Sequence, residues 1–139
     1  MKRFLFILFI CVIPSMSSLG QGFDVFSYKF YAQYDGQGKD ISSTSNYTGL
    51  SVTVASWTDF YGNTSYVLFG SESHTVAGMP AFSPLCPVND QLKFVGIRNG
   101  WRVFNYMNTV IVSISSDSNI ARVEKYGFNN YLGYTEYRK

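Results

Sequence analysis

Cys86 and His74 are the residues in this chain whose side chains could support nucleophilic catalysis. A cysteine thiolate becomes an effective nucleophile when an imidazole takes its proton, and such partners meet in space rather than in sequence. His74 is the only histidine, and no glycine-flanked nucleophile turn surrounds either residue. We therefore expect His74 to be a surface residue beside Glu72. Cys86 is expected to be a buried small side chain, with a bridge to another chain as the alternative.

Paired carboxylates are a second source of hydrolytic chemistry. Glycoside hydrolysis needs two acids facing each other across a cleft. Asp35 and Asp40 instead share the glycine-rich segment 35–40, where aspartate typically accepts hydrogen bonds from turn amides. A small hydrolase using Cys86 or these loop carboxylates is thus the weakest functional interpretation. With one histidine and no zinc-motif spacing we expect no metal site, and without a phosphate-binding glycine loop we expect no cofactor.

Aromatic residues are the stronger candidates for binding. The chain has 11 tyrosines, two tryptophans and 12 phenylalanines, of which only Phe4, Phe6 and Phe9 precede residue 21. Because tyrosine needs water or a partner for its hydroxyl, many rings should lie at the rim of the domain. There they could stack on a sugar or anchor a protein partner. The predicted ligand-binding residues are Trp57, Tyr61, Trp101 and Phe82. That both tryptophans fill the core is an equally open alternative.

Three prolines lie close together around Cys86, within residues 78–87. Proline cannot donate a strand hydrogen bond, so this segment is predicted to lie outside the sheet. One interpretation is a stiff binding loop that loses little entropy on capturing a ligand, with Phe82 exposed on it. The favoured interpretation is a rigid crossover that closes one end of the domain.

Residues 1–20 have the three-part layout of a secretory signal peptide. A cationic start is followed by an unbroken apolar run at residues 4–13 and a tail rich in small residues, which predicts cleavage before Gln21. The apolar run is shorter than the roughly 20 residues that a membrane-spanning helix needs. We therefore expect a secreted, periplasmic or cell-surface protein whose residues 21–139 form a single β domain.

Charge and cysteine content narrow the class of that domain. Lys2 and Arg3 account for two of the 11 Lys+Arg, so nine remain in residues 21–139 against nine Asp+Glu. A neutral domain lacks the positive field that nucleic-acid binding usually requires, so nucleic acid is not an expected partner. No later segment is long and apolar enough for a membrane span. With Cys86 alone after residue 20, no internal disulfide can form.

Period-2 alternation and turn residues predict an all-β, mainly antiparallel fold: a β-sandwich or small barrel of about seven strands. The clearest signal is Asn99-Gly100 between two apolar runs, which predicts a hairpin with a type I′ turn. Residues 118–126 are ambiguous between a strand and a capped helix ended by Gly127, and the helix is favoured. The predicted strands are 23–34, 48–55, 66–69, 92–97, 101–104, 110–115 and 131–137.

Three functions are compatible with these features. The leading one is an exported, non-catalytic binding domain that recognises a carbohydrate or protein ligand through loop aromatics. The second is a structural or assembly subunit that pairs through an edge strand, with residues 23–34 as the candidate strand and a homo-oligomer as one outcome. The third is the small hydrolase described above. Asn46 and Asn63 match the N-glycosylation pattern, although that pattern is short and common by chance.

Overall fold

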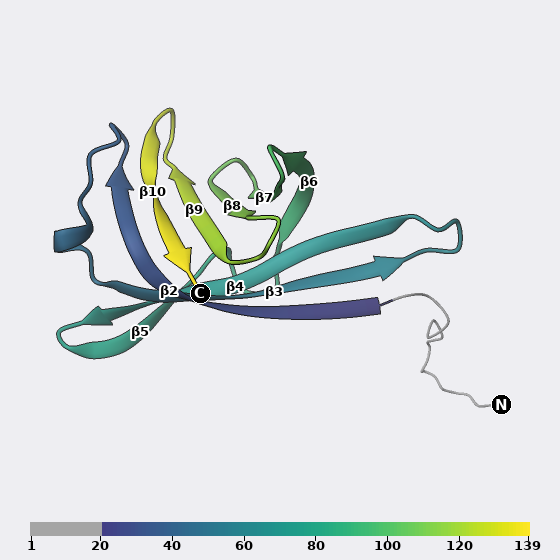
Figure 1. The fold of residues 1–139 in the computed structure, drawn as a ribbon, viewed down its shortest axis with the longest axis horizontal. Coiled ribbons are helices and arrows are strands. Elements are labelled where there is room, and N and C mark those ends of the chain that lie inside the picture. The colour runs from purple at the N-terminus through teal and green to yellow at the C-terminus, as the bar shows by residue number, and fades with distance from the viewer. Residues whose placement is uncertain (1–20) are drawn as a thin grey trace.

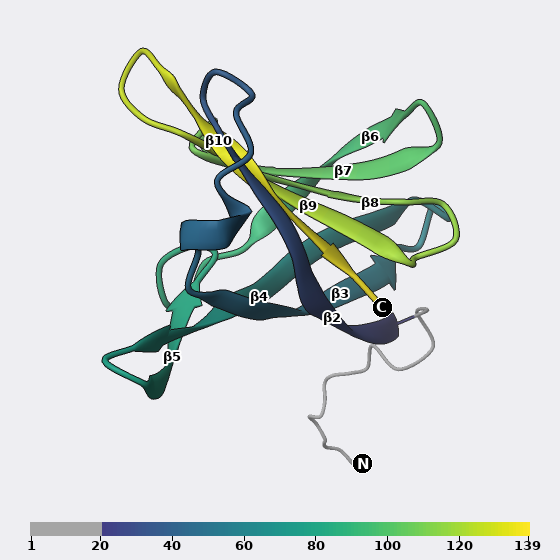
Figure 2. The same cartoon turned by 60° about the vertical axis from the view of Figure 1, so that its left-hand side comes forward.

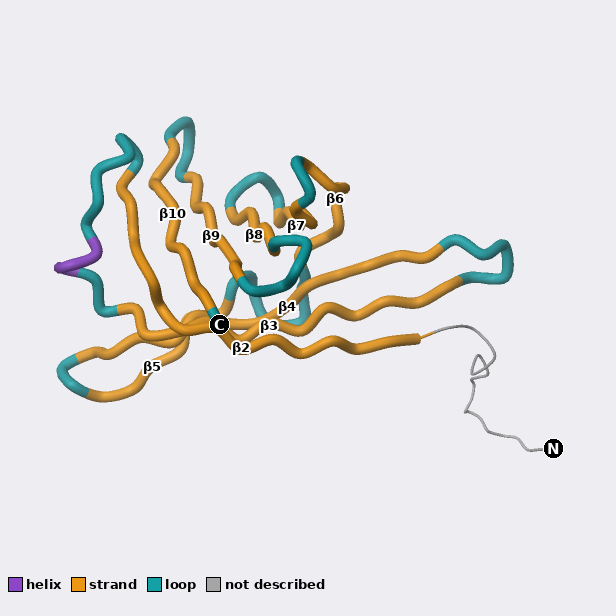
Figure 3. The backbone as a smooth tube through the Cα atoms, viewed as in Figure 1, coloured by secondary structure: helices purple, strands orange, loops and turns teal. Residues whose placement is uncertain are grey.

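The computed structural model describes residues 21–139, so the predicted signal peptide at residues 1–20 lies outside the described part. Strands make up most of this part, and its helical element is one short 3-10 turn, η1 (Ser42–Thr44) (Figure 3). The strands are β2 (Gln21–Asp35), β3 (Tyr47–Thr58), β4 (Thr64–Val76), β5 (Met79–Pro84), β6 (Leu92–Arg98), β7 (Trp101–Tyr106), β8 (Val110–Ile114), β9 (Ile120–Tyr126) and β10 (Tyr131–Arg138).

The sheet closes on itself. Its order is β3-β2-β10-β9-β8-β7-β6-β4, every neighbouring pair is antiparallel, and β4 returns to pair with β3. These eight strands form a barrel in which strands adjacent in sequence are mostly adjacent in space, while β5 pairs with β4 outside the ring (Figure 1). The predicted all-β antiparallel fold is confirmed, in its barrel form, with eight barrel strands and one extra.

Part of the sheet extends beyond the barrel as an arm. The arm consists of the first half of β2 together with the β3–β4 hairpin, whose tip projects away from the other strands (Figure 1). The β2–β10 pairing ends at Lys29 and Arg138, so residues 21–28 pair only with β3 within the described part of the chain. This leaves one edge of β2 without a strand neighbour there.

The Asn99-Gly100 turn forms as predicted. Both residues have positive φ, 52° and 83°, which a type I′ turn requires. The turn joins β6 to β7, with Arg98 paired to Trp101. Because the turn matches the strand twist, it fixes the register of this hairpin from local sequence alone.

The helix favoured for residues 118–126 is wrong, because the chain forms β9 there. Ala121 and Val123 are fully buried whereas Arg122 and Glu124 are not, which is a period-2 pattern. Pairing with both β8 and β10 satisfies the strand backbone on two sides. Local helix propensity is a weak preference, and these non-local pairings outweigh it.

The prediction that residues 78–87 lie outside the sheet is also wrong in part. Residues 79–84 form β5, which pairs with β4 through Pro80 opposite Thr75 and Pro84 opposite Ser71. β5 is the last strand in the sheet order, and an edge strand tolerates proline because one side needs no donors. The rule that proline is excluded from a sheet holds for central strands, but β5 is an edge strand.

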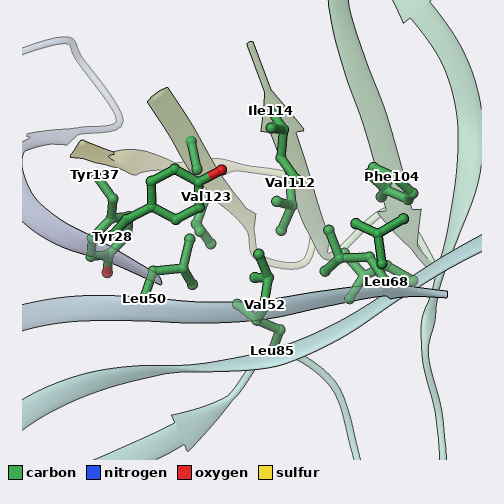
Figure 4. Close-up of a cluster of buried hydrophobic side chains, with 13 residues drawn as sticks. Tyr28, Leu50, Val52, Leu68, Leu85, Phe104, Val112, Ile114, Val123 and Tyr137 are labelled. Atoms are coloured by element: carbon green, nitrogen blue, oxygen red, sulfur yellow. The ribbon is translucent and has the colours of Figure 1, made fainter. Parts of the chain in front are cut away.

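Buried side chains from every barrel strand fill the interior (Figure 4). β3 contributes Val52 and β4 contributes Leu68, and the opposite wall contributes Phe104, Val112 and Val123. Eight strands give an interior that side chains can fill, with room for at most a small ligand. The packed centre therefore separates the two ends of the barrel.

Candidate functional site

The four predicted binding aromatics lie at separate places. Trp57 and Tyr61 belong to the arm hairpin, Phe82 to the edge strand β5, and Trp101 to the start of β7. Tyr61 is 90 % exposed and Phe82 is 71 % exposed. The two tryptophans line different grooves and neither belongs to the buried core. The structure thus does not assemble these residues into a single site.

Trp101 lies in a groove that combines its indole ring with charged and polar side chains. This Trp101 groove has a volume of about 300 Å³ and runs over the outer face of β7, β8 and β9. Cross-strand pairing aligns Val103 with Ser113 and Ser113 with Arg122, so these side chains share one face of the wall. The groove is lined by Arg98, Asn99, Trp101, Val103, Ile111, Ser113, Arg122, Glu124 and Tyr126.

An ion-pair network centred on the buried carboxylate of Glu136 holds Arg122 in this groove. The Arg122 guanidinium lies 4.7 Å from the Trp101 ring centroid, within cation–π range. Its Nε donates to Oε1 of Glu136 at 2.9 Å, and Arg138 donates to the other carboxylate oxygen. Glu136 is only 4 % exposed although it lies on the outer wall. Arg122 is therefore fixed from two sides, which orients the indole.

Tyrosines extend the groove toward β10. The Tyr126 hydroxyl donates to Oε1 of Glu124 at 3.3 Å, and its ring packs 5.1 Å from that of Tyr131. Burial, followed by the Glu124 charge, raises the pKa of both phenols, in Tyr131 to about 12. Both phenols therefore stay protonated at neutral pH and offer hydroxyl groups beside a carboxylate.

Cys86 and Asp35, which were considered for hydrolysis, make hydrogen bonds to the backbone of their own loops. Burial, and then Asp90, raises the pKa of the Cys86 thiol, which donates a hydrogen bond to the Asp90 carbonyl at 3.3 Å. Cys86 is half-buried, so it is less enclosed than predicted. Asp35 accepts bonds from the amides of Gln37 and Lys39, as expected for a turn aspartate. A thiol with a raised pKa supplies little thiolate.

Sequence reasoning missed a buried charged cluster at one end of the barrel. Glu72 is 1 % exposed, and its carboxylate lies 2.6 Å from Nζ of Lys125. Tyr137 donates its hydroxyl to the same carboxylate, and Lys125 donates to the Tyr47 hydroxyl at 3.0 Å. We call these four residues the Glu72 cluster. Glu72 lies four residues after the buried Leu68 in the same strand, so the two side chains point to the same face of the sheet. That period-2 alternation was the sequence signal that could have predicted the burial of Glu72.

His74 lies at the border of that cluster rather than at an ordinary surface position. Its ring meets the Tyr47 ring edge-on at 5.9 Å, and its Nδ1 atom is buried without a hydrogen-bond partner in the described structure. Burial opposes the charged form of Lys125, but the charge and hydrogen bond of Glu72, together with the Tyr47 hydroxyl, outweigh burial and raise the pKa of that ammonium. The cluster therefore holds a charged pair inside the sheet.

Within residues 21–139 there is no grouping of three His, Cys, Asp or Glu side chains that could hold a metal ion. The same residues contain no helix with the length and apolar character needed to cross a bilayer.

No protein family, curated protein or solved structure that was compared with this chain matches it.

Proposed function

We propose that this protein is a non-catalytic binding domain whose Trp101 groove receives a carbohydrate. The observation that carries the proposal is the composition of the groove. An indole ring lies beside a guanidinium, an amide, a hydroxyl and a carboxylate on one wall, contributed by Trp101, Arg122, Asn99, Ser113 and Glu124. Sugars present both apolar C–H faces and many hydroxyls, and a ring surrounded by polar groups of both kinds complements them.

The rigidity of the wall supports this proposal. Arg122 is fixed by Glu136 and lies against Trp101, so little side-chain entropy remains to be lost when a ligand binds. Strand-borne residues also hold their geometry better than loop residues. A ring held in one orientation is the kind of surface on which a small hydroxylated ligand can gain affinity.

Glycan-array binding tests the proposal. The variant Trp101→Ala should lose binding by at least about tenfold, since truncating a central aromatic anchor typically costs more than 1 kcal/mol. The matched control is Trp57→Ala, which removes a tryptophan from the arm and should leave binding unchanged. Circular dichroism confirms that both variants fold. An array without any bound glycan, or equal binding by Trp101→Ala, refutes the carbohydrate assignment.

Export is part of this proposal. The layout of residues 1–20 supports it, and the test is the N-terminal sequence of the protein recovered outside the cytoplasm. Mature protein should begin at Gln21. Protein that keeps residues 1–20 and stays in the cytoplasm contradicts export without affecting the carbohydrate test.

Assembly through β2 is the second candidate function. Its specific support is the edge of residues 21–28, which has no strand neighbour among residues 21–139, together with Phe23 and Val25, which are 68 % and 69 % exposed. An open, apolar edge is a template for strand addition. Val25→Lys should abolish concentration-dependent oligomers in sedimentation, whereas Lys29→Gln should not. A monomer at all concentrations argues against self-assembly.

A further inference from the structure

The barrel is open at the end opposite the Glu72 cluster, where a second pocket enters its interior. This Arg102 pocket has a volume of about 240 Å³ and is lined by Val54, Tyr66, Phe94, Ile97, Arg102 and Phe104. Figure 2 shows the tips of the β6–β7 and β8–β9 hairpins on one side of the barrel, with the C-terminus beside them. The pocket is lined by residues of β3, β4, β6 and β7, and Ile97 and Arg102 lie beside the β6–β7 turn.

Aromatic rings make the pocket a pre-formed apolar site. Tyr66 and Phe94 meet edge-on with centroids 5.3 Å apart, and Phe94 lies 5.4 Å from Phe104. Phe104 belongs to the core, so the deep side of the pocket is anchored in packed interior. Ile97 is 69 % exposed and marks the outer rim. Such rings offer a large contact area with little motion to lose on binding.

The Arg102 side chain lines this apolar pocket, and its guanidinium lies at the border, where it contacts Ser118 and Phe26. It pairs with Ile97 and Ile114 in the sheet, and Ile114 is fully buried, so its side chain starts from the inner face of β7. Its Nη2 donates to the Ser118 hydroxyl at 2.9 Å, and its guanidinium lies 5.8 Å from the Phe26 ring centroid. These contacts fix the group but leave its charge uncompensated.

No carboxylate within residues 21–139 lies within 4.0 Å of Arg102, in contrast to Arg122, Lys125 and Arg138, which all form ion pairs. Asp117 is the acidic residue near this mouth, and it accepts bonds from the Ser115 hydroxyl and the Asn119 amide instead. A charge beside apolar surface is costly unless it is paired. The half-buried Arg102 guanidinium is therefore free to take an anionic partner.

A second cation lies at the same mouth. The Lys139 ammonium is 5.1 Å from the Phe26 ring centroid and 5.9 Å from that of Tyr28. Lys139 is joined to the rim loop through its backbone amide, which donates to the Asn119 carbonyl. With Asp117 as the acidic side chain near this mouth, Arg102 and Lys139 leave an excess of one positive side-chain charge there, and that excess favours anions.

From this geometry we propose that the Arg102 pocket binds a small amphipathic carboxylate, with its apolar body among Tyr66, Phe94 and Phe104 and its carboxylate on Arg102. A guanidinium pairs with carboxylates in a two-bond geometry that an ammonium cannot reproduce. The volume lies below the roughly 300–1,000 Å³ of pockets for drug-sized ligands, so the occupant is a short-chain or single-ring acid. This site is separate from the Trp101 groove.

Three probes with the same apolar chain and different head groups test the proposal by titration calorimetry on the purified protein. They are octanoate, 1-octanol and octylammonium. Octanoate should bind at least tenfold more tightly than octanol, and octylammonium should bind most weakly because it faces two cations. Equal affinity for octanoate and octanol, or no octanoate binding at millimolar concentration, overturns the proposal.

Variants assign the binding to Arg102. Arg102→Met should lower octanoate affinity at least tenfold while leaving octanol unchanged, and Arg102→Lys should recover part of the loss. The matched control is Arg98→Gln, which removes a guanidinium from the same hairpin but on the outer face, and should have no effect. Octanoate binding that survives Arg102→Met at full affinity refutes the assignment. If Arg102→Met fails to fold, Arg102→Gln removes the same charge with a polar side chain and supplies the comparison.

The two binding proposals fail independently. Trp101→Ala should keep octanoate binding, and Arg102→Met should keep glycan binding. Loss of octanoate affinity in Trp101→Ala would contradict the separation of the two sites.

Discussion

Lys125 and Arg102 both extend from the inner face of the barrel wall, one toward each end. At one end Lys125 meets Glu72 at 2.6 Å, and the tyrosines Tyr47 and Tyr137 complete the hydrogen bonds of the pair. At the other end Arg102 has a hydroxyl and a ring as partners, and an aromatic pocket opens beside it. The same wall thus carries an ion-paired cation at one end and, at the other, a cation without a carboxylate partner within the described residues.

This difference distinguishes polar groups that stabilise the inside of a barrel from polar groups that can bind a ligand there. An ion pair that is also bonded to two neighbouring tyrosines contributes to a unique packing and leaves little for a ligand to gain. An unpaired cation beside preformed apolar surface gives a ligand both a charge to neutralise and area to cover. We therefore expect the Glu72 end to respond to mutation in stability and the Arg102 end to respond in binding.

The largest expected effect is at Glu72. Glu72→Ala leaves Lys125 and Tyr137 without their shared partner and should lower the free energy of unfolding by about 3 kcal/mol, as measured by urea denaturation. The double variant Glu72→Ala/Lys125→Met should recover part of that loss because the unpaired charge is gone. Glu124→Ala on the outer wall is the matched control and should cost under about 1 kcal/mol. A neutral Glu72→Ala variant would contradict the structural role of the cluster.

Removing single hydroxyls should give the next largest effects. Tyr137→Phe deletes a buried bond to a carboxylate and should cost about 2 kcal/mol, whereas Tyr28→Phe deletes a bond to the Ser118 carbonyl and should cost about 1 kcal/mol. Thermal and urea unfolding of both variants measure this ratio. Equal costs at the two sites would show that the Glu72 charge adds nothing to the Tyr137 bond.

Alkaline pH should weaken the fold gradually. Burial raises the pKa of both phenols, Tyr137 and Tyr28, above the ordinary value of 10.0. The Glu72 carboxylate adds to the rise in Tyr137. Arg102 opposes part of the rise in Tyr28, whose pKa reaches about 12. Above pH 10 the unfolded chain loses these protons first, so stability is full below pH 10 and falls as pH rises toward 12. Urea midpoints between pH 8 and 11 measure the decline. It should be smaller in Tyr137→Phe, and an identical slope would exclude Tyr137 as a source.

The smallest stability change is expected at Arg102. Arg102→Met breaks no ion pair and replaces a cation beside apolar rings with an apolar side chain, so the free energy of unfolding should stay within about 1 kcal/mol of the parent value. The same urea titration measures it. A loss comparable to that of Glu72→Ala would mean that Arg102 is structural after all, and the contrast between the two ends would disappear.

Much of the local structure could be predicted from sequence because its causes are local. Alternation at residues 23–34 predicted β2, and Asn99-Gly100 predicted the β6–β7 turn through the positive φ that both residues adopt. Residues 118–126 and 79–84 were misjudged because their strand pairing depends on distant segments. A local propensity cannot show that β8 and β10 will enclose β9, or that β5 will occupy an edge.

The candidate sites were predictable only in part. Trp101 stood out by type and by its place beside a turn, but its partners Arg122 and Glu136 lie on strands that only the register brings alongside it. The sequence by itself determined an antiparallel sheet, neutral charge after residue 20 and an excess of aromatic rings. Closure of the barrel decided that Lys125 meets a carboxylate and Arg102 does not. Charge pairing across a sheet depends on the strand register, and the packing of the whole ring of strands sets that register.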